Sequence, residues 1–155
     1  PQVWERASAA GARPVGADAL AIVRVEAGIP LAGVDMDEDN LAPEVGLADA
    51  ISFRKGCYIG QEVVERVAAR GNVQRRLVGL RVDGDGPVPA RSALVAEGRE
   101  AGHVTSCVVS PGHGVIALAY ARRAVWDPGA AVDVVVDGTP RRATVAALPF
   151  APPPR

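Results

Sequence analysis

The chain has 155 residues, of which 48% are hydrophobic and only 4% aromatic, so its core must be built from Val, Ala, Leu and Ile. Its formal net charge of -1 provides no basic excess for a phosphate backbone, which argues against direct nucleic-acid binding. Two cysteines are too few for a disulfide framework, and no apolar run is long enough to span a membrane. We therefore expect a cytoplasmic protein of about one domain that makes no membrane contact.

Two short helices are predicted at the start of the chain. Residues 3–10 are good helix formers, and Gly11 follows them as a stop. Asp18 is the expected N-cap of a second helix over residues 19–27, which Gly28 ends. A third helix is predicted over residues 61–69, closed by Gly71.

An acidic stretch follows the second helix, and we expect it to form an exposed loop together with a turn at 43–46. Its carboxylates are Asp35, Asp37, Glu38 and Asp39. Their alternation is not that of a calcium-binding EF-hand, because Asn40 and Gly46 stand where that loop needs Gly and Glu.

From residue 74 onward, short Val- and Leu-rich runs alternate with turn residues, which is typical of strands. The predicted strands are residues 77–82, 93–96, 103–109, 115–119, 132–136 and 143–148. Asp137-Gly138 between the last two predicts a hairpin turn. Helices before strands indicate an α+β fold that ends in a small antiparallel β-barrel of about six strands.

Cys57 lies between Gly56 and Gly60, in a tight loop just ahead of the third predicted helix. A helix N-terminus and the nearby Lys55 both favour the thiolate form, which would make this cysteine reactive. The alternative is a small buried hydrophobic residue in a turn, the common role of a free cysteine. Local chemistry alone leaves both interpretations open.

The segment around this cysteine resembles the K-G-C-[FY]-x-G-Q-E signature of the YgfZ-type folate-binding proteins, a branch of the glycine-cleavage T-protein (GcvT, aminomethyltransferase) superfamily. Lys55, Gly56, Cys57, Tyr58, Gly60, Gln61 and Glu62 match it. The segments R-x-E-A-G at 24–28 and G-x-D at 33–35 also resemble that family, as do landmarks at 75–80, at the 102–106 turn, at 110–111 and at 148–150.

The resemblance divides the chain into four parts. Residues 1–54 would be the end of a T-protein-like folate-binding α+β domain whose beginning precedes Pro1. Residues 55–73 would form the Cys-signature loop and helix, residues 74–150 the carboxyl-terminal β-barrel, and residues 151–155 a disordered tail.

The resemblance also implies a site for tetrahydrofolate or a related reduced folate. It places Glu26, with Arg24 of the same segment, at the pterin ring, and Arg54 or Lys55 at the glutamate tail. From the residues alone, Glu26 is instead a helix-end carboxylate that reaches solvent from the apolar face of Ala19, Ile22 and Val23.

The family's function implies a folate-dependent accessory protein of iron–sulfur cluster assembly or repair, with Cys57 as the catalytic thiol. Its partners would be iron–sulfur assembly or client proteins, and it would influence cluster-dependent tRNA modification indirectly. One alternative is a tetrahydrofolate-dependent aminomethyltransferase of the glycine cleavage type, an enzyme; another is a non-catalytic docking module for cluster carriers.

No metal site is expected. Cys57, His103, Cys107 and His113 show no CxxC or paired-His spacing, and Cys107 falls inside a predicted strand, which favours a structural role.

Overall fold

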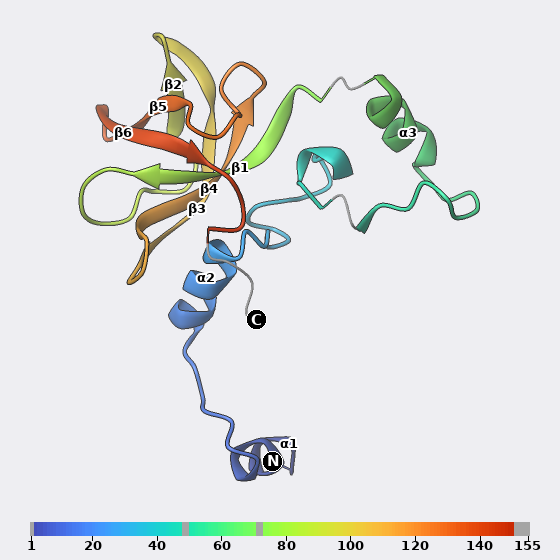
Figure 1. Cartoon of the computed structure of the whole chain (residues 1–155), viewed down its shortest axis with the longest axis vertical. Coiled ribbons are helices and arrows are strands. Elements are labelled where there is room, and N and C mark those ends of the chain that lie inside the picture. Colours follow the sequence, from blue (N-terminus) through green and yellow to red (C-terminus); the bar gives the residue numbers. More distant parts are fainter. Residues whose placement is uncertain (1, 48–49, 71–72, 151–155) are drawn as a thin grey trace.

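The structure, a computed structural model, describes residues 2–47, 50–70 and 73–150. Within that part of the chain, six antiparallel strands close into a barrel in the order β1-β4-β3-β2-β5-β6 (Figure 1). The strands are β1 (Arg75–Val82), β2 (Ala93–Ala96), β3 (Arg99–Ser110), β4 (Gly114–Arg122), β5 (Ala131–Val136) and β6 (Thr139–Ala146). The α+β class and the six-stranded barrel predicted from the sequence are confirmed.

The six predicted strand positions are correct, but several bounds are not. β3 begins at Arg99, and residues 102–106, which the sequence suggested as a turn, lie within it. β6 ends at Ala146 rather than at residue 148, because the chain leaves the sheet before the cis Leu148-Pro149 bond. The Asp137-Gly138 turn is confirmed, since it joins Val136 to its partner Thr139.

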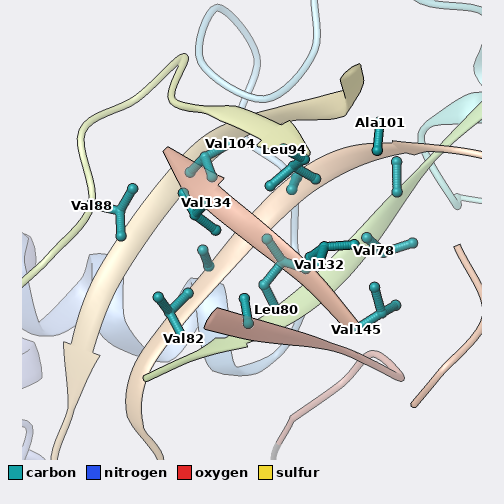
Figure 2. Close-up of a cluster of buried hydrophobic side chains, with 14 of the residues drawn as sticks. Val78, Leu80, Val82, Val88, Leu94, Ala101, Val104, Val132, Val134 and Val145 are labelled. Carbon is teal, nitrogen blue, oxygen red and sulfur yellow. The ribbon is translucent and has the colours of Figure 1, made fainter. Parts of the chain in front are cut away.

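β4 is buried on both faces, which explains its nearly continuous apolar sequence. Its alternate residues Val115, Ala117, Ala119 and Ala121 join the core inside the barrel. That core is built largely of Val and Ala, and Figure 2 shows its Val side chains together with Leu80, Leu94 and Ala101. The opposite face joins a second cluster outside the barrel, which consists of Val25, Leu77, Ile116, Leu118, Tyr120 and Phe150.

α2 (Ala17–Glu26) covers this outer face of the barrel (Figure 1) and contributes Val25, its one buried residue, to the second cluster. The helix begins earlier than predicted. Gly16 is the N-cap, and Asp18 lies in the first turn, where its carboxylate still complements the helix dipole. The predicted N-cap role of Asp18 is therefore wrong.

The other helical segments lie outside the barrel. α1 (Gln2–Ala9) has no buried residue and stands apart from the rest in Figure 1. The 3-10 helix η1 (Ala42–Glu44) and α3 (Gln61–Arg70) belong to an arm that leads back to β1. The predicted stop at Gly71 and the predicted disordered tail at 151–155 lie outside the described residues.

Candidate functional site

α2 ends in a local backbone motif that requires a residue with positive φ. The Gly28 N–H donates to Val25 O and the Ile29 N–H donates to Arg24 O, the two hydrogen bonds of a Schellman cap. Gly28 has φ +69, and a Cβ there would approach Leu148 to 2.9 Å. The helix therefore stops directly after Glu26, and the chain turns back toward the strands.

Arg24 anchors this turn through a buried network. Its guanidinium donates to the Ile29 carbonyl at 2.9 Å, to Asp35 Oδ2 at 2.5 Å and to Ser106 Oγ at 2.8 Å. Thr105 Oγ1 donates to the other Asp35 oxygen at 2.5 Å. Asp35 is 1% exposed, so the expectation that it lies in an exposed loop is wrong. A buried carboxylate needs such pairing, and Arg24 supplies it.

Glu26 lies beside this network. Its side chain is half-buried, and its Oε1 accepts a hydrogen bond of 2.5 Å from Ser110 Oγ. The Ser110 oxygen itself accepts two 3.1 Å hydrogen bonds, from the Gly112 and His113 N–H groups of the β3–β4 turn. Val23, which the sequence places on the same face, is 59% exposed. The carboxylate is thus oriented by the barrel at a partly open surface, where it can accept further donors.

Cys57 lies in a loop just before α3, as predicted, and its side chain is exposed. The Lys55 ammonium lies over the Tyr58 ring, 4.7 Å from its centre. The Gln61 side chain accepts a 3.4 Å hydrogen bond from the Tyr58 N–H, which ties this loop to the first residue of α3. Exposure favours the reactive interpretation of this cysteine over the buried one.

The remaining signature residues are solvent-facing. Glu62 pairs with Arg66 one turn along α3, and Gly56 and Gly60 are exposed. The Arg54 side chain is exposed too, and its backbone N–H donates to Ser52 Oγ at 3.4 Å. The structure therefore gathers Arg24 and Glu26 at the barrel, whereas Figure 1 shows the arm that carries Cys57, Arg54 and Lys55 well away from α2.

Cys107 behaves as predicted for a strand residue. It packs against the barrel core and accepts a hydrogen bond of 3.2 Å from the Val88 N–H at its Sγ. Burial is the largest influence on its thiol and raises its pKa above the ordinary value.

The described residues show neither a metal-binding cluster nor a membrane-spanning helix. They contain no group of three or more His, Cys, Asp or Glu side chains arranged to hold a metal ion. Nor do they include a helix with the length and hydropathy needed to cross a membrane.

Residues 75–151 match the glycine cleavage T-protein C-terminal barrel domain. The barrel belongs to the glycine cleavage T-protein superfamily.

Relatives extend the similarity of the T-protein barrel to nearly the whole chain. The chain is 36% identical over 151 residues to the aminomethyltransferase of Herpetosiphon aurantiacus, covering 96% of this chain and 42% of that protein. It is also 36% identical over 151 residues to the aminomethyltransferase of Picosynechococcus sp., covering 96% and 41%. The chain thus spans about two fifths of the length of these relatives.

A solved structure agrees. The chain superposes on the glycine cleavage system aminomethyltransferase T of Bartonella henselae with a TM-score of 0.75 and 27% identity, covering 83% of this chain and 37% of that one. The likeness supports the T-protein superfamily, while nothing in these comparisons distinguishes the YgfZ branch.

Sequence reasoning missed most of the polar groups that the T-protein barrel brings to α2. Asp35 was expected in solvent, and Thr105 and Ser106 had no assigned role. Ser110 was noted only as part of a family landmark. A usable signal was present for Asp35, because it is the one charged residue of the family-like segment at 33–35, and Arg24 in the segment at 24–28 carries the opposite charge.

Proposed function

We propose that this chain is part of a protein that binds a reduced folate, tetrahydrofolate or a close derivative, with Glu26 as an acceptor for donors on the pterin ring. The observation that carries the proposal is the similarity to aminomethyltransferases over 96% of the chain, which includes both α2 and the barrel. The local geometry supports it, because the Glu26 carboxylate is held by Ser110 at a surface that is only partly covered.

Of the activities considered, tetrahydrofolate-dependent aminomethyl transfer has the better support. The curated relatives are named aminomethyltransferases, whereas the preference for iron–sulfur cluster assembly or repair rests on the Cys57 signature and not on the relatives. The chain would then contribute one part of the folate site, and Arg54 or Lys55 would meet the glutamate tail only if the arm closes toward α2.

The iron–sulfur accessory role remains a second candidate because of one observation. Cys57 is exposed, whereas a structural cysteine would be covered, and its loop, KGCYIGQE, matches the K-G-C-[FY]-x-G-Q-E signature. Its partners would be cluster-assembly or client proteins, with an indirect effect on tRNA modification. The domain boundaries expected from the sequence, at 54, 73 and 150, belong to the same proposal.

The role of Arg24 changes within this proposal. Its guanidinium is engaged by Ile29, Asp35 and Ser106, so it is better placed to orient the end of α2 than to touch folate. Arg24 is therefore proposed as a positioning residue for Glu26, two residues along the helix.

Calorimetric titration of the full-length gene product with tetrahydrofolate tests the folate proposal. Glu26→Gln should weaken binding about ten- to hundredfold, because an amide offers one oxygen acceptor where the carboxylate offers two. Glu5→Gln is the matched control, since Glu5 lies in the exposed α1. Equal affinities for wild type and Glu26→Gln would remove Glu26 from the site, and no binding by the wild type would favour the docking-module alternative.

Activity assays separate the two candidates. Aminomethyl transfer from a lipoyl carrier to tetrahydrofolate, unaffected by Cys57→Ala, would establish the first. Loss of cluster-dependent enzyme activity in cells carrying Cys57→Ala, with no transfer activity in the purified wild type, would establish the second.

A further inference from the structure

A cavity of about 400 Å³ lies where the loop after α2 meets the wall of the barrel. Asp37 and Asp39 line it from the loop, and Arg75, Arg91, His103 and Tyr120 line it from the barrel side. Glu26 and Cys57 are not among its lining residues, although Asp35 and Thr105 of the Arg24 network border it.

Tyr120 provides the strongest indication of a ligand. The residue is 2% exposed, and within the described residues its hydroxyl is buried without a hydrogen-bond partner. Its ring is fixed by neighbours that also line the cavity, with the Arg75 guanidinium 5.2 Å and the His103 ring 5.8 Å from its centre. Buried polar groups are nearly always satisfied, so an unpartnered hydroxyl at a cavity calls for an explanation.

The state of these groups at neutral pH follows from burial. Burial, opposed by Arg75, raises the pKa of Tyr120 to about 12, so its hydroxyl keeps its proton and can donate. Burial, with the positive charges of Arg75 and Arg91, lowers the pKa of His103, which favours a neutral imidazole. A neutral imidazole offers one donor and one acceptor.

The charges around the cavity are divided between its two sides. Arg24 neutralises Asp35 at its edge, and Glu44 pairs with Arg75 at 3.1 Å. Arg91 remains as the positive group on the barrel side, while Asp37 and Asp39 are the carboxylates on the loop side. A ligand that satisfies both sides must carry an anionic and a cationic group.

We propose that this cavity binds a free α-amino acid as its zwitterion. The ligand carboxylate accepts hydrogen bonds from the Tyr120 hydroxyl and the Arg91 guanidinium, and its ammonium group faces Asp37 and Asp39. The volume suits a small ligand, and the charged groups from the loop and from the barrel side would orient it. The folate proposal plays no part in this inference.

Titration of the purified 155-residue chain with glycine, L-serine and L-glutamine tests the proposal. At least one should bind saturably, and its N-acetyl derivative, which lacks the ammonium charge, should bind at least about tenfold more weakly. Tyr120→Phe and Arg91→Gln should each weaken binding about ten- to hundredfold. Arg142→Gln is the control, because Arg142 pairs with Asp133 on other strands and should leave the affinity unchanged.

Tyr120→Phe also separates a ligand-binding hydroxyl from a structural one. In the absence of amino acid, this variant should melt at the same temperature as wild type or higher, since it loses only an unsatisfied buried group. A marked drop in melting temperature would assign the hydroxyl a structural partner and overturn the proposal. Absence of saturable binding by all three amino acids, or full retention of affinity in the N-acetyl derivative, would overturn it too.

Competition with tetrahydrofolate tests whether the cavity belongs to a folate site. If it displaces the bound amino acid from wild type and Tyr120→Phe weakens both ligands alike, the cavity belongs to a folate site and the amino-acid proposal fails. Independent binding of the two ligands supports the proposal.

Discussion

The two cysteine thiols lie in different surroundings. Cys57 is exposed ahead of α3, whereas Cys107 is half-buried against the barrel core and accepts a hydrogen bond from Val88. Their chemistry should therefore differ although both are free thiols.

Cys57 should react faster than Cys107 with a mild alkylating agent at neutral pH. The reagent can reach the exposed Cys57 thiol directly. Burial raises the pKa of the Cys107 thiol, which reduces the fraction present as thiolate. Mass-spectrometric labelling rates of the single-thiol variants Cys57→Ser and Cys107→Ser would measure this. Equal rates would contradict the loop environment described for Cys57.

The pH dependence of stability should contain a contribution from Tyr120. Because the pKa of Tyr120 is raised to about 12 from the ordinary 10, the unfolded chain loses this proton first as pH rises. Its contribution to stability is present below pH 10 and is lost as the pH rises from 10 through 12. Urea unfolding at several pH values should show a steeper decline across this window for wild type than for Tyr120→Phe. Parallel curves would contradict it.

The buried Arg24–Asp35 pair should matter more to stability than an exposed pair of the same type. Arg24→Leu leaves the fully buried Asp35 carboxylate without its counter-ion, and should lower the free energy of unfolding by about 3–5 kcal/mol. Arg66→Leu breaks an exposed pair with Glu62 and should cost about 0.5 kcal/mol or less. Similar losses in the two variants, measured by urea unfolding, would refute the buried network.

At the scale of elements, the sequence correctly predicted the strands and turns that depend on neighbouring residues. Val132, Val134 and the Asp137-Gly138 turn identify one hairpin, because alternation and turn chemistry act between neighbours. Asp35 was misplaced because its partners Arg24 and Thr105 lie 11 and 70 residues away, and an acidic run by itself indicates solvent. The start of β3 was missed because Gly102 was interpreted as part of a turn.

Gly102 is in fact required by close strand pairing. A Cβ at this position would lie 1.9 Å from the Tyr120 carbonyl oxygen on β4. Gly102→Ala should therefore destabilise the barrel by more than about 4 kcal/mol or prevent folding, through strain at a special backbone position. Gly112→Ala is the control, since its nearest contact is Ser110 Oγ at 3.9 Å. A thermal melt that is alike for both variants would show that the strands can separate without penalty.

At the scale of the whole molecule, the segment after β6 attaches α2 to the barrel. The Phe150 N–H donates to the Glu26 carbonyl at 2.7 Å, and its side chain is 8% exposed in the cluster with Val25 and Leu118. The orientation of Glu26 therefore depends on residues at both ends of the chain, which no local pattern around Glu26 could reveal.

Phe150→Ala should loosen α2 while leaving the barrel intact. Removing a buried aromatic side chain costs about 3–5 kcal/mol when it is fully packed, and here the loss falls on the α2 contact. Hydrogen exchange should show faster exchange at α2 amides and unchanged protection in β4 and β5. Uniform loss of protection would mean that α2 and the barrel unfold as one unit.

Barrel closure brings the first and last strands together. β1 and β6 pair antiparallel, with Gly79 opposite Ala146, so the start of β1 and the end of β6 lie toward the same end of this strand pair. Entry and exit toward one end permit circular permutation of the barrel, with new termini opened at Asp137-Gly138 and a linker joining the old ones. The barrel is thus a cassette that evolution or an engineer could transfer between proteins without rearranging its sheet.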